Sequence, residues 1–173
     1  MADRTSSSIT VAAPRVVVMG VIADFAAYPD WATGVRSAEI VGSGADGRPV
    51  TVRFELDAGL VRDRYVLAYR WDGDAEVRWD LSEAGSMISE LSGCYMLADD
   101  GGGTKVTYEL AVGLRIPMIG MMRRRAEKTI IDTALKGLRS RTEVVLADGV
   151  GGQGVAGAPG GVGSGSARGG GND

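Results

Sequence analysis

The amino-acid sequence predicts an α+β fold, in which a curved antiparallel sheet of about seven strands wraps around one long C-terminal helix. Apolar and polar residues alternate with a period of two from Val35 to Ile116, as half-buried strands require. From Pro117 to Ala147 the period becomes helical, and at 1.5 Å per residue this helix is roughly 45 Å long. Because a sheet with one apolar face must be covered, we expect the helix to lie on that face.

Upstream of this region the chain predicts one strand and two short helices. The strand spans Ser7 to Val11. Pro14 suits the first turn of a helix, where its missing N–H costs nothing, and the apolar segment Val16 to Asp24 continues that helix. The residue before a proline is driven out of the α conformation, so Tyr28-Pro29-Asp30-Trp31 forms a turn or a second short helix.

Four clearly alternating stretches are predicted strands. Their apolar positions are Val52, Phe54 and Leu56, then Tyr65, Leu67, Tyr69 and Trp71, then Val77, Trp79 and Leu81, and finally Val106, Tyr108, Leu110, Val112 and Leu114. The segments Asp72-Gly73-Asp74 and Asp99 to Gly103 are turn sequences, which indicates an antiparallel meander. Between them Met87 to Leu97 alternates less regularly, and Tyr95 and Leu97 are expected on one face.

The predicted helix carries a long apolar stripe, expected to face the sheet. Its members recur at spacings of three and four and are Ile119, Met122, Ala126, Ile130, Thr133 and Gly137. Four further residues, Ile131, Leu135, Leu138 and Val145, widen the stripe. Charged residues opposite it form the solvated face, namely Arg125, Lys128, Asp132, Lys136 and Arg139.

Composition limits the domain organisation and the chemistry. Of the 173 residues, 148–173 hold 12 of the 27 glycines and little to bury, so we expect one domain over residues 1–147 and a disordered tail. No segment is apolar enough to span a membrane, and the first residues lack the pattern of a secretory signal, which predicts a cytoplasmic protein. With no histidine and one cysteine, metal sites and imidazole-based catalysis are not expected.

Aromatic residues of the strands face small or flexible residues of the helix, and two interpretations remain open. Either these side chains fill the core, or they line a cavity beneath the helix. The candidate ligand-binding residues are Trp31, Phe54, Tyr69, Trp79, Tyr95, Tyr108, Ile119, Met122, Ala126, Ile130 and Thr133.

Three sequence segments resemble a known family. They are Val21 to Trp31, the strand Gly93-Cys94-Tyr95-Met96-Leu97, and Gly103 to Tyr108 before the long last helix. Together they resemble the START-like, or Bet v 1-like, superfamily, and within it the bacterial polyketide cyclase/dehydrase and coenzyme Q-binding branch. The resemblance covers about residues 6–147. It implies a helix-grip fold with a deep apolar cavity that binds lipids, quinones, steroids or polyketides, and it transfers no catalytic residue.

The preferred hypothesis is therefore binding of a lipid, quinone or polyketide in that cavity, without a cofactor. The second is a cyclase or dehydratase in which a buried tyrosine acts as the acid, with Glu90 or Glu55 as base. Cys94 lacks a histidine partner, so we interpret it as structural.

The third hypothesis is a partner-binding protein that uses Arg123, Arg124 and Arg125. Three cations near a helix start oppose the helix dipole, so they suggest contact with an anionic membrane surface or another acidic partner. Specific nucleic-acid binding is not expected.

Overall fold

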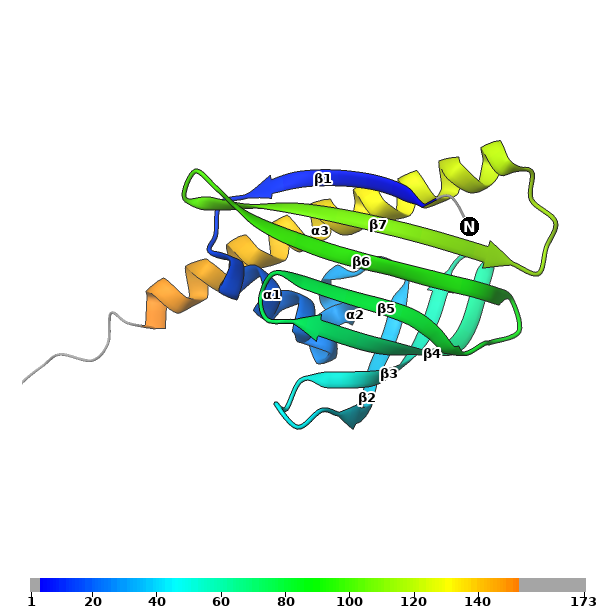
Figure 1. The fold of residues 1–173 in the computed structure, drawn as a ribbon, viewed down its shortest axis with the longest axis horizontal. Coiled ribbons are helices and arrows are strands. Elements are labelled where there is room, and N and C mark those ends of the chain that lie inside the picture. Colours follow the sequence, from blue (N-terminus) through cyan, green and yellow to red (C-terminus); the bar gives the residue numbers. More distant parts are fainter. Residues whose placement is uncertain (1–3, 153–173) are drawn as a thin grey trace, which may run out of the picture.

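The structure is a computed structural model and describes residues 4–152 (Figure 1). In chain order its elements are β1 (Thr5–Val11), α1 (Arg15–Ala23), the 3-10 helix η1 (Phe25–Ala27), α2 (Tyr28–Trp31), β2 (Val35–Ser43), β3 (Pro49–Ala58), β4 (Val61–Asp72), β5 (Glu76–Glu83), β6 (Ile88–Asp100), β7 (Gly103–Leu114) and α3 (Gly120–Gly152). The predicted α+β fold is confirmed.

All seven strands form one antiparallel sheet in the order β1-β7-β6-β5-β4-β3-β2. The strands β2 to β7 form the predicted meander. Strand β1 is the edge strand next to β7, with Thr5 paired to Leu110 and Val11 paired to Thr104. Figure 1 shows the sheet curving around α1 and α2, while α3 runs along the edge formed by β1 and β7. The core therefore lies between the inner face of the sheet and the helices.

The short helices are fixed by apolar contacts and by one buried hydrogen bond. Pro14, with φ of −62°, stands directly before α1, as its fixed backbone geometry favours. Val18 and Met19 of α1 are fully buried, and so is Phe25 of η1. The Tyr28 hydroxyl donates a hydrogen bond of 2.6 Å to the carbonyl oxygen of Ile22, which attaches α2 to the end of α1.

The predicted burial of α3 needs a correction. Ile131, Leu135 and Leu138, expected only to widen the buried stripe, form its centre. The stripe expected to face the sheet is exposed at Ile119, Met122, Ala126, Ile130 and Thr133. Val145 is also exposed.

Two apolar rows on one helix explain this error. Spacing identifies both rows but does not select the one that is buried. Glu127 determines which row is buried. Its carboxylate lies on the same side of the helix as the buried row and accepts a hydrogen bond from the sheet.

The end of α3 also differs from the prediction, because the helix continues to Gly152 rather than ending at Ala147. The rest of the predicted tail, residues 153–173, lies outside the described residues. Within the described part, no helix combines the length and the apolarity needed to cross a bilayer.

Candidate functional site

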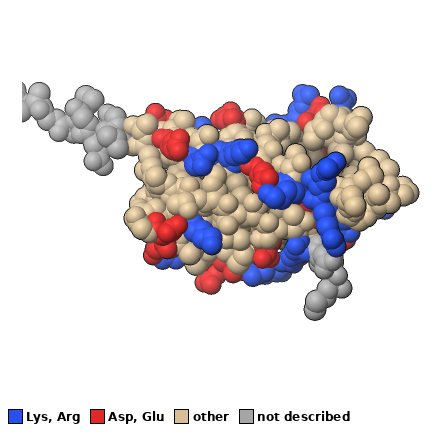
Figure 2. Space-filling model, turned by 90° about the horizontal axis from the view of Figure 1, so that it is seen from above, with Lys and Arg blue, Asp and Glu red and all other residues tan. Residues whose placement is uncertain are grey.

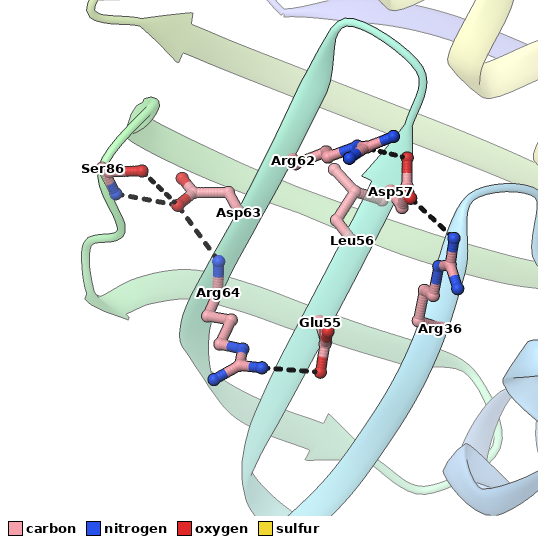
Figure 3. A pocket seen from close by; sticks show the side chains of 8 residues that line it. All are labelled: Arg36, Glu55, Leu56, Asp57, Arg62, Asp63, Arg64 and Ser86. Atoms are coloured by element: carbon pink, nitrogen blue, oxygen red, sulfur yellow. Dashed lines mark hydrogen bonds and ion pairs between the residues drawn. The ribbon is translucent and has the colours of Figure 1, made fainter.

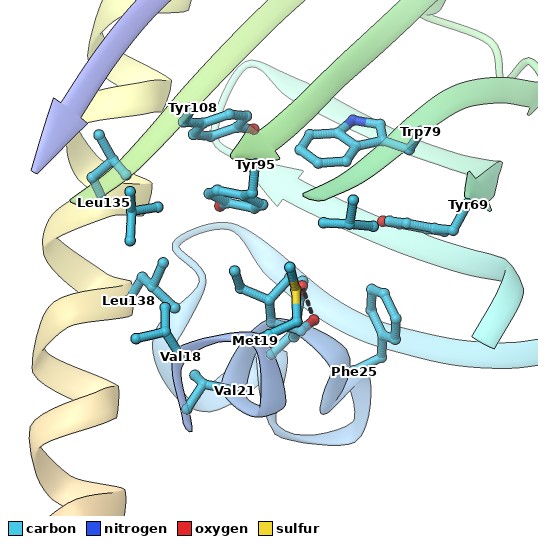
Figure 4. Close-up of a cluster of buried hydrophobic side chains, with 14 of the residues drawn as sticks. Val18, Met19, Val21, Phe25, Tyr69, Trp79, Tyr95, Tyr108, Leu135 and Leu138 are labelled. Carbon is cyan, nitrogen blue, oxygen red and sulfur yellow. Dashed lines mark hydrogen bonds between the residues drawn. The ribbon is translucent and has the colours of Figure 1, made fainter. Parts of the chain in front are cut away.

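Aromatic side chains from neighbouring strands converge on the inner face of the sheet. The strand register places Phe54 opposite Tyr65, Tyr69 opposite Trp79, and Tyr95 opposite Tyr108. Directly opposed residues share one face, so all six rings point inward. Figure 4 shows Tyr69, Trp79, Tyr95 and Tyr108 on one side, across from α1.

These rings pack closely against one another. The centroids of Tyr95 and Tyr108 are 4.5 Å apart, and Trp79 lies 5.4 Å from Tyr95 and 5.9 Å from Tyr69. The Trp79 ring depends on Gly93, because a Cβ atom there would lie 2.6 Å from an atom of the indole. Gly93 faces Trp79 across the strand pair, so it provides the room that the large side chain needs.

Four tyrosine hydroxyls in this cluster have no hydrogen-bond partner among the described residues. They belong to Tyr65, Tyr69, Tyr95 and Tyr108, whose side chains are 6–8% exposed. Within residues 4–152, Trp31 Nε1 is the one side-chain nitrogen or oxygen that water cannot reach and that has no hydrogen-bond partner. The four tyrosine oxygens also lack a partner, but they do not belong to this inaccessible class. Each of the four hydroxyl oxygens therefore keeps some surface that a molecule the size of water can reach. The interior is accordingly lined by aromatic rings and unpaired polar groups.

The electrostatics of the cluster keep these hydroxyls protonated. Burial raises the pKa of Tyr65, Tyr69, Tyr95 and Tyr108 well above the ordinary value of 10.0. A phenolate would lose its hydration in this apolar environment, so the neutral phenol is favoured. At neutral pH the interior therefore presents hydrogen-bond donors that can reach an acceptor oxygen.

The opposite wall comes from the helices. Figure 4 shows Val18, Met19 and Val21 of α1 below the aromatic rings and Leu135 and Leu138 of α3 beside them. All five are buried and apolar. The site thus combines an apolar wall with an aromatic wall that carries hydroxyls.

The strand residues predicted for the site are brought together, and Trp31 borders them. Phe54, Tyr69, Trp79, Tyr95 and Tyr108 all belong to the buried cluster. Trp31 is partly buried, with its ring centroid 4.9 Å from that of Tyr28. It also packs against α3 at Gly137, where a Cβ atom would lie 2.8 Å from the Trp31 carbonyl oxygen.

The helix residues predicted for the site lie elsewhere. The side chains of Ile119, Met122 and Ile130 are 66%, 57% and 45% exposed, and Ala126 and Thr133 are exposed as well. The expectation that they face the sheet is wrong. Their contact with a ligand stays a prediction.

Sequence reasoning missed several residues of this interior. Tyr65 alternates in phase with Tyr69, so the pattern that selected Tyr69 would also have selected Tyr65. Phe25 and Met19 are fully buried, but they lie on short helical segments whose orientation no period specifies. Glu127 was not identified either, because a charged residue on a helix ordinarily faces solvent.

A surface depression at the β3–β4 hairpin has a different character. Figure 3 shows its lining of Arg36, Glu55, Leu56, Asp57, Arg62, Asp63, Arg64 and Ser86. Asp57 pairs with Arg36 at 2.7 Å and with Arg62 at 3.2 Å, so the charges largely satisfy one another. Their contacts lower the pKa of Asp57, with the hydrogen bond from Arg36 the main cause.

Asp63 in the same depression holds the β5–β6 loop. Its carboxylate accepts hydrogen bonds from the backbone N–H groups of Ser86, Met87 and Ile88 at 2.8, 3.0 and 2.7 Å. Burial raises the pKa of Asp63, but these backbone donors outweigh it and lower the pKa overall. Asp63 therefore has a structural role.

The predicted bases do not lie at the aromatic interior. Glu55 pairs with Arg64 at 3.4 Å, and Glu90 pairs with Arg123 at 3.5 Å. Cys94 is fully buried, and burial raises the pKa of its thiol to about 11, which favours the unreactive protonated form.

The curved sheet, the long terminal helix and the aromatic interior between them define a helix-grip protein of the START-like, or Bet v 1-like, class. Residues 2–143 match the model of a family described as polyketide cyclase / dehydrase and lipid transport. The chain belongs to this family. The comparison with curated proteins found no match.

Three solved structures share the fold at low identity. A START superfamily protein from Mycobacterium smegmatis has a TM-score of 0.76 at 21% identity, over 82% of this chain and 98% of that one. A protein from Thermus thermophilus has a TM-score of 0.68 at 21% identity, over 83% and 99%. The Zhui aromatase/cyclase from a Streptomyces species has a TM-score of 0.68 at 17% identity, over 83% and 94%.

Proposed function

We propose that this chain binds a small apolar molecule that carries acceptor oxygens, such as a lipid, a quinone or a polyketide, between the sheet and the helices. The observation that carries the proposal is the set of four buried tyrosine hydroxyls without a partner among the described residues. Because each hydroxyl oxygen keeps some surface that water can reach, a ligand oxygen would take the place of water, and each hydrogen bond gained would be worth about 0.5–1.5 kcal/mol. Carbonyl and hydroxyl oxygens of a ligand are suitable acceptors.

Membership of the family and the apolar wall support the same proposal. The family description names lipid transport alongside cyclisation and dehydration. Val18, Met19 and Leu135 are fully packed, so they would contact the hydrocarbon part of a ligand after a shift of side chains, and methionine adapts to varied shapes.

Binding is favoured over catalysis because the buried carboxylates already have partners. Asp63 accepts backbone hydrogen bonds and Glu127 contacts β1 and β7. A cyclase or dehydratase would also need a group that removes a proton from its substrate. The hydroxyls alone supply donors, which position an oxygen but do not abstract a proton at neutral pH.

The test measures binding of a naphthoquinone probe to the purified full chain by titration calorimetry. We expect one probe per chain, and a weaker affinity, by roughly twofold to tenfold per lost hydrogen bond, for Tyr95→Phe and Tyr108→Phe. Tyr28→Phe is the matched control, because the Tyr28 hydroxyl already donates to Ile22 and is not available to a ligand.

Native mass spectrometry and organic extraction of the purified protein give an independent readout. A co-purified apolar molecule near one per chain supports the proposal. A protein that carries none, and that also fails to bind the quinone and other apolar probes, would show a filled core and overturn it.

A further inference from the structure

An exposed apolar surface marks the end of the molecule where α3 begins. Ile116, Ile119, Met121 and Met122 are 54%, 66%, 80% and 57% exposed, and we call these four residues the apolar cap. Figure 2 shows an uncharged surface at the right-hand end of the molecule, bordered by Lys and Arg side chains. Clustered large apolar side chains on a surface indicate an interaction site more often than scattered ones do.

Basic side chains surround the cap. Residues 115–128 contain Arg115, Arg123, Arg124, Arg125 and Lys128 but a single carboxylate, Glu127, which gives this segment a net charge of +4 in a chain of net charge −3. Glu127 is buried. Its negative charge is therefore directed into the fold rather than toward the surface.

Arg123 serves the fold itself. Its guanidinium lies 3.3 Å from Glu127 and 3.5 Å from Glu90, and its side chain is 32% exposed. Lys128 likewise pairs with Asp132 at 2.5 Å. We therefore assign Arg115 and Arg125 to the basic collar and leave Arg123 and Lys128 out. This corrects the interpretation of Arg123, Arg124 and Arg125 as one equivalent patch.

We propose that the apolar cap and the basic collar dock this end of the molecule onto a bilayer that contains anionic lipids. Isoleucine and methionine side chains of the cap would enter the boundary between headgroups and acyl chains. In the collar, Arg115 directly precedes the cap and Arg125 follows it on α3, and both would then lie at the depth of the lipid phosphates, where each basic residue strengthens the attraction. This charge complementarity favours an anionic bilayer as the occupant.

The helix dipole does not explain these cations. Because α3 begins at Gly120, Arg124 and Arg125 lie in its second turn, beyond the first turn in which the dipole acts on charged side chains. The proposal goes beyond binding of a small molecule, and its test needs no such ligand.

The experiment is flotation of the full chain with vesicles of phosphatidylcholine alone and of phosphatidylcholine mixed with phosphatidylglycerol. We expect binding to the anionic vesicles at low salt, weakening as salt is added, and little binding to neutral vesicles. The cap variant Ile119→Gln with Met122→Gln and the collar variant Arg115→Gln with Arg125→Gln should each lower partitioning about tenfold or more.

Two matched controls distinguish docking at the cap and collar from nonspecific hydrophobic adsorption and from a simple change of net charge. Ile40→Gln with Val41→Gln removes apolar side chains that are 46% and 42% exposed on the edge strand β2. Arg53→Gln with Arg70→Gln removes two exposed cations from the sheet. Both controls should bind anionic vesicles as the parent chain does, and circular dichroism should show all four variants folded.

Several results would overturn the proposal. Failure of the parent chain to float with anionic vesicles at low salt is one. The proposal would also be wrong if the cap and collar variants bound anionic vesicles as well as the parent chain does. The same holds if the control variants lost as much binding as the cap and collar variants. If sedimentation instead reveals a dimer that the cap variant abolishes, without vesicle binding, the cap is a contact between two copies of this chain.

Discussion

Among single residues, the tyrosines divide by what their hydroxyls do. The Tyr28 hydroxyl donates to the carbonyl oxygen of Ile22, in the last turn of α1, where helix carbonyls have no partner within the helix. The hydroxyls of Tyr65, Tyr69, Tyr95 and Tyr108 make no such bond among the described residues. The first hydroxyl therefore stabilises the fold, and the other four make no hydrogen bond of this kind to it.

This division predicts opposite effects on stability and on binding. Tyr28→Phe leaves the Ile22 carbonyl unpaired and should lower the free energy of unfolding by about 1–2 kcal/mol. Tyr95→Phe removes no internal hydrogen bond and should change it by less than about 0.5 kcal/mol. Urea unfolding followed by circular dichroism measures both. Equal losses would mean that the Tyr95 hydroxyl has a structural partner.

At the level of secondary-structure elements, one buried carboxylate fixes α3 to the sheet. Glu127 accepts hydrogen bonds from the Thr5 hydroxyl at 2.5 Å and from the Val112 N–H at 2.9 Å. Val112 lies beyond Leu110, whose pairing with Thr5 is the last between β1 and β7. Glu127 thus satisfies an N–H of β7 where β1 no longer extends, and it joins three elements.

Removing this carboxylate should loosen α3. Glu127→Ala leaves the part-buried Thr5 hydroxyl and Val112 N–H without their acceptor, and we expect a loss of at least about 2 kcal/mol in the free energy of unfolding. Glu127→Gln keeps an oxygen that accepts from Val112 and should cost less. Glu143→Gln, on an exposed part of α3, is the control and should be neutral. Thermal unfolding of the three variants tests this, and similar values for Ala and Gln at position 127 would contradict it.

Glu127 also shows why some elements were predictable and others were not. A strand has only two faces, so alternation alone assigned Tyr69, Trp79 and Tyr108 correctly to the inner one. A helix has a continuous circumference, and α3 carries two apolar rows that spacing cannot rank. The buried row was set by the partners of Glu127 on β1 and β7, which are distant in sequence and leave no periodic signal.

Considered as a whole molecule, the protein places all five of its tyrosines on the inside of the fold. Burial raises the pKa of every one of them, including Tyr28, above the ordinary value of 10.0. In the unfolded chain the same phenols ionise near that value. The folded state therefore holds more protons than the unfolded state once the pH exceeds about 10, and stability falls as the pH rises further.

A spectrophotometric titration should reveal this linkage directly. Phenolate absorbance should stay low through pH 10, where an exposed tyrosine is half ionised, and should then rise together with the loss of near-ultraviolet circular dichroism. The two signals coincide because unfolding exposes the phenols to water. If phenolate absorbance rises near pH 10 while the circular dichroism stays native, water hydrates the interior well enough to support charge there. That result would indicate a more polar interior than the apolar wall of α1 suggests, and the proposed binding would then favour a more polar ligand.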